Sequence, residues 1–89
     1  MRKLSADHVA LGLVIRDSRW ELALTQEELG ARCGLHRTYV ASVERGERNL
    51  GYANVLKIAA ALGLRPHQLV RAAESRAKPP GTRRVTLPR

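Results

Sequence analysis

The segment 25–45 constrains the fold more than any other part of the chain. Thr25 with a glutamate three residues later is the pattern of a capping box, which predicts the start of a helix. Gly34 can adopt the left-handed conformation that ends a helix, so this first helix is expected over 26–33. A second short helix is expected over 37–45 after a tight turn. The segment therefore predicts a helix-turn-helix unit.

A helix-turn-helix makes three packing demands, and this sequence meets each of them. The first helix needs a small residue where the second crosses it, and Gly30 supplies one. Leu35 can fill the corner beneath the turn as an apolar plug. Val40 and Val43 can form the buried face of the second helix. The outer positions of that helix are then polar or small: Arg37, Thr38, Ala41 and Ser42.

Three further helices are expected around this unit. Ser5 can cap a helix over 6–21, where apolar residues recur at helical spacing. A second apolar helix is expected over 52–62. Pro66 suits the first position of a last helix over 66–74. The predicted fold class is therefore all-α, a compact domain of five helices.

The positive charge is concentrated at the C-terminal end. The 89 residues carry a net charge of +8, of which residues 1–70 contribute +3 and residues 71–89 contribute +5. Three of the four prolines also follow residue 74, so we interpret 75–89 as a flexible basic tail on one small domain, 1–74. A basic chain favours a polyanionic partner, most commonly nucleic acid. A merely soluble surface or an affinity for acidic lipid are the alternatives.

Residues suited to metal binding, disulfides or catalysis are sparse. Cys33 is the one cysteine, so the chain can form neither an internal disulfide nor a thiolate metal site. The three histidines have no ligand spacing, and we expect no metal and no cofactor. No arrangement typical of catalysis stands out, so an enzyme is not expected. No segment approaches the roughly 18 apolar residues of a membrane helix, and we expect a cytoplasmic, nucleoid-associated protein without a membrane partner.

The sequence around the predicted turn also resembles a known family. The run LTQEELGARCGLHRTYVASVERGERNL looks like the Cro/cI-type (lambda-repressor-like) helix-turn-helix transcriptional regulators of bacteria and phages, and the likeness covers about residues 8–72. The stretches Arg37-Thr38-Tyr39, Glu44-Arg45-Gly46 and Arg48-Asn49-Leu50 particularly resemble restriction–modification controller proteins. Two positions depart from the family pattern. Gly30 stands where alanine is usual, and His36 stands where serine, threonine or aspartate usually caps the second helix.

The resemblance implies which residues contact double-stranded DNA. The second helix becomes a recognition helix in the major groove, with these base-contacting residues: Arg37, Thr38, Ala41 and Ser42. Arginine can bind guanine O6 and N7 with two hydrogen bonds; for Arg37 the alternative is a phosphate contact alone. The residues expected at phosphates are Gln26, Tyr39, Arg45, Arg48 and Asn49. Core packing is an equal alternative for Tyr39, and a solvated loop is the alternative for the last three.

Two structural interactions are implied as well. Arg19 and Glu44 are expected to pair across the first and third helices and to fix the recognition helix. The family commonly dimerises through its last helix, which assigns Leu69, Val70 and Ala73 to a homodimer interface. A two-fold dimer places its recognition helices about 34 Å apart, one turn of DNA, and so implies a palindromic operator.

These expectations favour a sequence-specific regulator of transcription, acting as a repressor or as an activator. A second hypothesis is an antitoxin, an interaction protein that neutralises a partner toxin and also binds its own operator. The tail 75–89 is the candidate segment for such a protein partner, but Val85 and Leu87 are its only two apolar anchors. A third hypothesis is an accessory to a nucleic-acid enzyme, for which the chain offers no catalytic group.

Overall fold

Five helices make up the part of the protein that the structure describes. The computed structural model describes residues 3–77, among which no strand occurs. The helices are α1 (Ala6–Glu21), α2 (Gln26–Cys33), α3 (Arg37–Glu44), α4 (Tyr52–Ala61) and α5 (Pro66–Ala77). The predicted all-α class is confirmed, and each helix begins where it was expected. The helices α3 and α4 end one residue earlier than predicted. None of the helices within residues 3–77 is long and apolar enough to cross a membrane.

The last helix, α5, continues three residues past its predicted end. Arg76 Nη1 donates a hydrogen bond to Asp17 Oδ2 at 2.7 Å, and this ion pair ties the last turn of α5 to α1. The prolines that argued against a helix begin only at position 79, so residues 75–77 keep their backbone donors. The predicted start of the tail at residue 75 is therefore wrong. The rest of the predicted tail, 78–89, lies outside the described residues.

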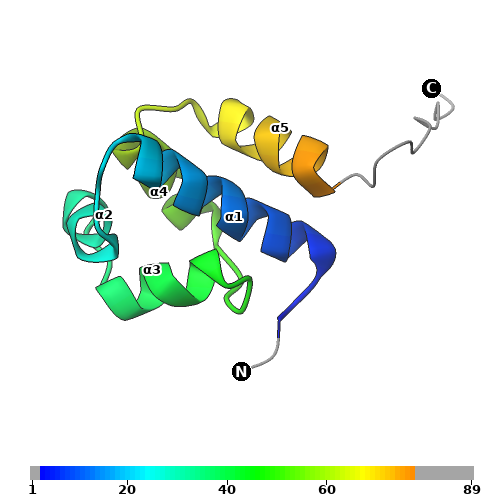
Figure 1. Ribbon diagram of the computed structural model, residues 1–89, viewed down its shortest axis with the longest axis horizontal. Coiled ribbons are helices and arrows are strands. Elements are labelled where there is room, and N and C mark those ends of the chain that lie inside the picture. Colours follow the sequence, from blue (N-terminus) through cyan, green and yellow to red (C-terminus); the bar gives the residue numbers. More distant parts are fainter. Residues whose placement is uncertain (1–2, 78–89) are drawn as a thin grey trace, which may run out of the picture.

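The helix α1 is the central element of the fold. In Figure 1, α1 runs between α5 on one side and α3 on the other, and it packs against both. The core is largely aliphatic and contains no phenylalanine. Each helix supplies one of the largest fully buried side chains: Ile15, Leu29, Val40, Ile58 and Leu69. Burying a side chain of this size stabilises the fold by about 1.5–3 kcal/mol, so all five helices contribute to one core.

Two glycines allow backbones to approach closely at the helix-turn-helix. A Cβ added at Gly12 of α1 would lie 2.7 Å from the carbonyl oxygen of Glu44 and would also strike that of Val43. A Cβ added at Gly30 of α2 would strike the carbonyl oxygen of Leu35. The small residue predicted at Gly30 is thus confirmed by its contact. Gly12, which sequence reasoning did not single out, does the same for the crossing of α1 and α3.

We predict that Gly12→Ala destabilises the fold. Forcing a methyl group into a packed contact typically costs about 1–3 kcal/mol, while alanine in place of a helical glycine recovers about 1 kcal/mol. Thermal unfolding followed by circular dichroism should therefore give a lower Tm than the wild type. Gly51→Ala is the control, since no atom lies within 4 Å of a Cβ at that position. A Tm at or above the wild-type value for Gly12→Ala would contradict the tight crossing.

Candidate nucleic-acid interface

The first helix of the motif, α2, begins and ends as its sequence predicts. The Thr25 hydroxyl accepts a hydrogen bond from the Glu28 N–H at 3.0 Å, and Glu28 Oε1 accepts one from the Thr25 N–H at 2.8 Å. The predicted capping box is therefore present. The hydrogen bond from the Thr25 backbone, aided by that from its side chain, holds the pKa of Glu28 below its usual value. Gly34 ends α2 in the left-handed region, with φ of 71°.

The second helix, α3, is capped by a histidine. Nδ1 of His36 accepts a hydrogen bond from the Thr38 N–H at 3.1 Å and lies 2.8 Å from the Thr38 hydroxyl oxygen. An Nδ1 that accepts carries no hydrogen, so the imidazole has its hydrogen on Nε2. His36 thus satisfies a free N–H at the start of the helix. The unusual cap does not shift the helix, which begins at Arg37 as predicted.

The outer edge of α3 presents fewer side chains than the sequence predicted. Arg37 and Thr38 are exposed, and Ala41 is half-buried. Ser42 is 5% exposed, and its hydroxyl donates a hydrogen bond to the Tyr39 carbonyl oxygen at 2.8 Å. The expectation that Ser42 contacts bases is therefore wrong. A hydroxyl that bonds one turn back along its own helix and is covered by neighbours cannot reach a groove.

Tyr39 packs against the core, which is one of the two alternatives that its sequence left open, and its contact with a phosphate stays a prediction. Its ring is half-buried and packs against the hydrophobic core. Its hydroxyl oxygen accepts a hydrogen bond from Asn54 Nδ2 of α4 at 3.0 Å. The guanidinium of Arg48 lies over the same ring, with Cζ 5.1 Å from the ring centroid. Asn54 was not predicted, because no local pattern relates residues on α3 and α4 across the intervening loop.

The loop after α3 carries the other predicted phosphate contacts. Arg45 is exposed, and its Nε donates a hydrogen bond to Glu47 Oε1 at 3.0 Å. Asn49 is also exposed, and its Oδ1 lies 3.3 Å from Nε2 of His8 in the first turn of α1. The N–H of Leu4 donates to the Gly46 carbonyl oxygen at 2.9 Å. The start of the described chain is therefore attached to the loop that follows α3.

A buried ion pair joins α1 to α3. Arg19 Nε donates to Glu44 Oε2 at 2.7 Å, and Arg19 Nη2 donates to Glu44 Oε1 at 2.8 Å. The third nitrogen of the guanidinium, Nη1, donates to the Leu24 carbonyl oxygen at 2.9 Å. The hydrogen bond to Glu44 raises the pKa of Arg19. The predicted pair is present in the two-point geometry that fixes both partners.

The same carboxylate reaches the predicted DNA contact at the start of α2. Gln26 Nε2 donates a hydrogen bond to Glu44 Oε1 at 3.0 Å. An amide nitrogen carries two hydrogens, so one N–H of Gln26 is held by Glu44 and the other is left for a partner outside. Gln26 is half-buried at the first position of α2. The ion pair therefore orients a side chain on each helix of the motif.

We predict that Glu44→Ala lowers the free energy of unfolding by about 3–5 kcal/mol, because Arg19 is left as an uncompensated buried charge. Chemical denaturation at neutral pH measures the loss. The double variant Arg19→Met with Glu44→Leu removes both charges and should recover most of the stability. If Glu44→Ala unfolds at the wild-type denaturant concentration, the pair does not hold α3 in place.

The predicted dimer residues on α5 do not share one face. Leu69 is fully buried and Ala73 is 8% exposed, whereas Val70 is 44% exposed. Residues four apart lie on the same side of a helix, so Leu69 and Ala73 both belong to the core of the monomer. Leu69 has no exposed surface to offer a second copy, so its assignment to a dimer interface is wrong. Ala73 also lines the hollow beside Val70, and its assignment stays a prediction. Val70 is available, beside a hollow of about 280 Å³ whose lining includes Leu11, Asp7 and Glu74.

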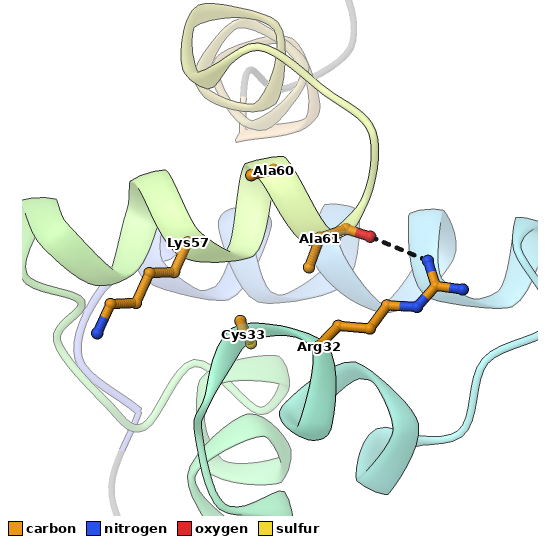
Figure 2. Close-up of a pocket in the computed structure, with 5 residues that line it drawn as sticks. All are labelled: Arg32, Cys33, Lys57, Ala60 and Ala61. Atoms are coloured by element: carbon orange, nitrogen blue, oxygen red, sulfur yellow. Dashed lines mark hydrogen bonds between the residues drawn. The ribbon is translucent and has the colours of Figure 1, made fainter.

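A shallow cleft of about 550 Å³ separates α2 from α4, and Figure 2 shows the residues that line it. Arg32 extends along one side and donates to the Ala61 carbonyl oxygen at 3.3 Å, while Lys57 extends in the other direction. Cys33 at the base is buried, and its thiol donates to the Leu29 carbonyl oxygen at 3.1 Å. Burial raises the pKa of this thiol. Cys33 therefore acts as a small apolar residue of the core.

Comparison with known proteins identifies the family. The profile of the helix-turn-helix family matches residues 15–69. The chain belongs to the helix-turn-helix family of Cro/cI type. Members of this family are DNA-binding transcriptional regulators.

Solved structures similar to this helix-turn-helix protein include controller proteins. The restriction–modification controller protein C.AhdI from Aeromonas hydrophila is 45% identical, with a TM-score of 0.71 over 73% of this chain and 98% of that one. The wild-type restriction–modification controller protein C.Esp1396I has a TM-score of 0.74 at 27% identity, over 82% of this chain and 94% of that one. The five-helix fold is therefore that of known controller proteins.

Curated relatives carry similar names. The control protein C.BamHI from Bacillus amyloliquefaciens is 47% identical over 47 residues, which is 53% of this chain and 58% of the relative. A hypothetical transcription factor from Neisseria meningitidis is 48% identical over 54 residues, which is 61% of this chain and 51% of the relative. The chain thus spans between half and three-fifths of the length of these two relatives.

Proposed function

We propose that this protein is a transcriptional regulator of the restriction–modification controller type, which binds a palindromic operator in double-stranded DNA as a homodimer. The observation that carries the proposal is the presentation of α3. Arg37 and Thr38 are exposed at its start, while Glu44 at its end is locked by a buried ion pair. A helix held in this way can enter the major groove with its first residues toward the bases. The names of the relatives support the controller type.

Base reading falls to the exposed edge of α3. Arg37 is the residue suited to guanine, which it binds through O6 and N7. The hydroxyl of Thr38 can bond to a base edge, and the methyl of Ala41 can meet a thymine methyl. Because His36 fixes the first turn, the backbone that carries Arg37 and Thr38 is ordered before DNA arrives. That order lowers the entropic cost of binding.

The side chains that contact phosphates lie on either side of the exposed edge of α3. Gln26 has one amide N–H free at the N-terminus of α2, where a helix favours an anion. Tyr39 and Arg48 lie together on the far side, and Arg45 and Asn49 are exposed in the loop that follows. Contacts of this kind set the register of the protein on the duplex without reading its sequence.

We predict that Arg37→Ala weakens binding by about 1–3 kcal/mol and relaxes preference at one base pair of each half-site. Selection of bound sequences from random double-stranded DNA, carried out with wild type and variant, measures both effects. Lys57→Ala is the matched control, because it removes the same charge from the cleft between α2 and α4. A uniform loss over all sequences would assign Arg37 to a phosphate instead.

The homodimer is proposed to form over Val70. This side chain is exposed beside the hollow between α1 and α5, where Leu11 adds apolar surface and Asp7 and Glu74 add a polar rim. An apolar centre with a polar edge is the usual composition of a protein interface. To bind two successive half-sites of a palindromic operator, this dimer must hold its two copies of α3 about 34 Å apart, one turn of DNA.

We predict that Val70→Glu shifts the protein toward monomers, because the dimer would have to bury two unpaired carboxylates at the two-fold axis. Light scattering at micromolar concentration reports the mass. The affinity of the Val70→Glu variant for the selected operator should fall together with the fraction of dimer. Leu22→Glu is the matched control, since Leu22 is 45% exposed and Val70 is 44% exposed. The dimer surface is refuted if both variants keep the same mass as the wild type.

A further inference from the structure

Side chains from three different elements meet beside the recognition helix. Tyr39 comes from α3, Arg48 from the loop that follows, and Asn54 from α4. Arg48 Cζ lies 5.1 Å from the centroid of the Tyr39 ring, and Asn54 Nδ2 lies 3.0 Å from the Tyr39 hydroxyl oxygen. The proposed function places Tyr39 and Arg48 at phosphates. It gives no role to Asn54.

The direction of the hydrogen bond between Asn54 and Tyr39 determines whether the Tyr39 hydroxyl can donate to another group. A phenol carries one hydrogen, and its oxygen can also accept. Because Asn54 is the donor in its bond to Tyr39, the hydroxyl keeps its own hydrogen. No hydrogen bond among residues 3–77 uses the Tyr39 hydroxyl as a donor to another side chain or backbone group. That hydrogen is therefore available to an external acceptor.

The position of Arg48 favours an anionic acceptor. Its guanidinium covers the ring of Tyr39, and its Nε lies 3.5 Å from the Ser42 hydroxyl oxygen. Ser42 in turn donates to the Tyr39 carbonyl oxygen at 2.8 Å. The positive charge and the free O–H are thus held on the same small area of surface. An anionic oxygen there would meet both an ionic partner and a hydrogen-bond donor.

The side chain of Asn54 is not needed to start its own helix. Gly51 is the residue before α4, and that helix has no side-chain cap. The backbone N–H of Asn54 donates to the Gly51 carbonyl oxygen at 3.0 Å. The amide group, in contrast, extends across to Tyr39 on a neighbouring element. The hydrogen bond that this amide donates to the Tyr39 hydroxyl oxygen therefore constrains the direction of the phenolic O–H.

We propose that Asn54 is a positioning residue for DNA binding: by donating to the Tyr39 oxygen, it directs the phenolic hydrogen at a DNA phosphate. The inference rests on the proposed function, in which Tyr39 contacts DNA. An amide turned over would accept the phenolic hydrogen and leave none for phosphate.

The substitution Asn54→Asp imposes that opposite arrangement. A carboxylate has the same shape as the amide but can only accept, so the Tyr39 hydroxyl must donate to it. Tyr39→Phe deletes the hydroxyl with the ring left in place. We expect Tyr39→Phe to lower the affinity for the selected operator about tenfold per half-site, the value of one hydrogen bond to a charged group. Asn54→Asp should lower it further, since it removes the same contact and adds a negative charge.

A double-mutant cycle separates these two effects. In the Tyr39→Phe background, Asn54→Asp should cost only the effect of its charge, so the combined loss should be about tenfold smaller per half-site than the product of the single losses. Ala53→Asp is the charge control, placed one residue earlier and without a bond to Tyr39; its loss should multiply with that of Tyr39→Phe. Asn54→Leu, a neutral variant of similar size, repeats the cycle if Asn54→Asp fails to fold.

Each outcome decides the inference. Coupling at Asn54 with none at Ala53 supports it. The inference is overturned if the losses in affinity from Asn54→Asp and from Ala53→Asp each simply multiply with the loss from Tyr39→Phe. It is also overturned if Tyr39→Phe binds the operator as tightly as the wild type. A merely structural Asn54 would lower Tm and weaken binding equally in both backgrounds. If the wild type selects no DNA sequence at all, the proposed function fails first; if the wild type selects an operator and only the cycle is multiplicative, Asn54 alone loses its role.

Discussion

The buried contact between Arg19 and Glu44 is the interaction on which the rest of the structure depends. It joins the last turn of α1 to the last turn of α3, and through Gln26 it also reaches the first turn of α2. Two charges removed from water gain little net free energy from each other, yet losing one of them is costly. The pair is therefore better understood as a device that selects one arrangement of three helices than as a source of stability.

The parts of the fold predicted from the sequence are those with local causes. Thr25, Gly34 and Pro66 act within a few residues of themselves, and each marks a helix boundary where the structure has one. The apolar spacing of α1 and α4 is likewise a property of single segments. Even His36 did not disturb this agreement, because an imidazole nitrogen can accept the same N–H that a hydroxyl would accept.

The failures have a common origin in packing between segments. Ser42 was placed on the outer edge of α3 because a hydroxyl is polar, but the loop after α3 covers it and its own helix satisfies it. Leu69 lies on an apolar stripe that suits either a core or an interface, and only the position of α1 decides. Packing between distant segments also determines the roles of Gly12 and Asn54. Gly12 contacts Glu44, 32 residues later in the chain, and Asn54 bonds to Tyr39, 15 residues earlier. Local sequence patterns carry no signal for such pairs, and the Arg19–Glu44 pair was expected only because the sequence resembles a known family.

The close approach at Gly12 has a consequence for how proteins of this shape diversify. There the end of α3 rests on α1 through main-chain atoms, so the angle of the recognition helix does not depend on the size of any side chain at that point. The residues that lock α3 and the residues that α3 exposes are separate sets. If residues 37, 38 and 41 contact bases as proposed, substitutions there would change the preferred DNA sequence without changing the angle at which α3 is held.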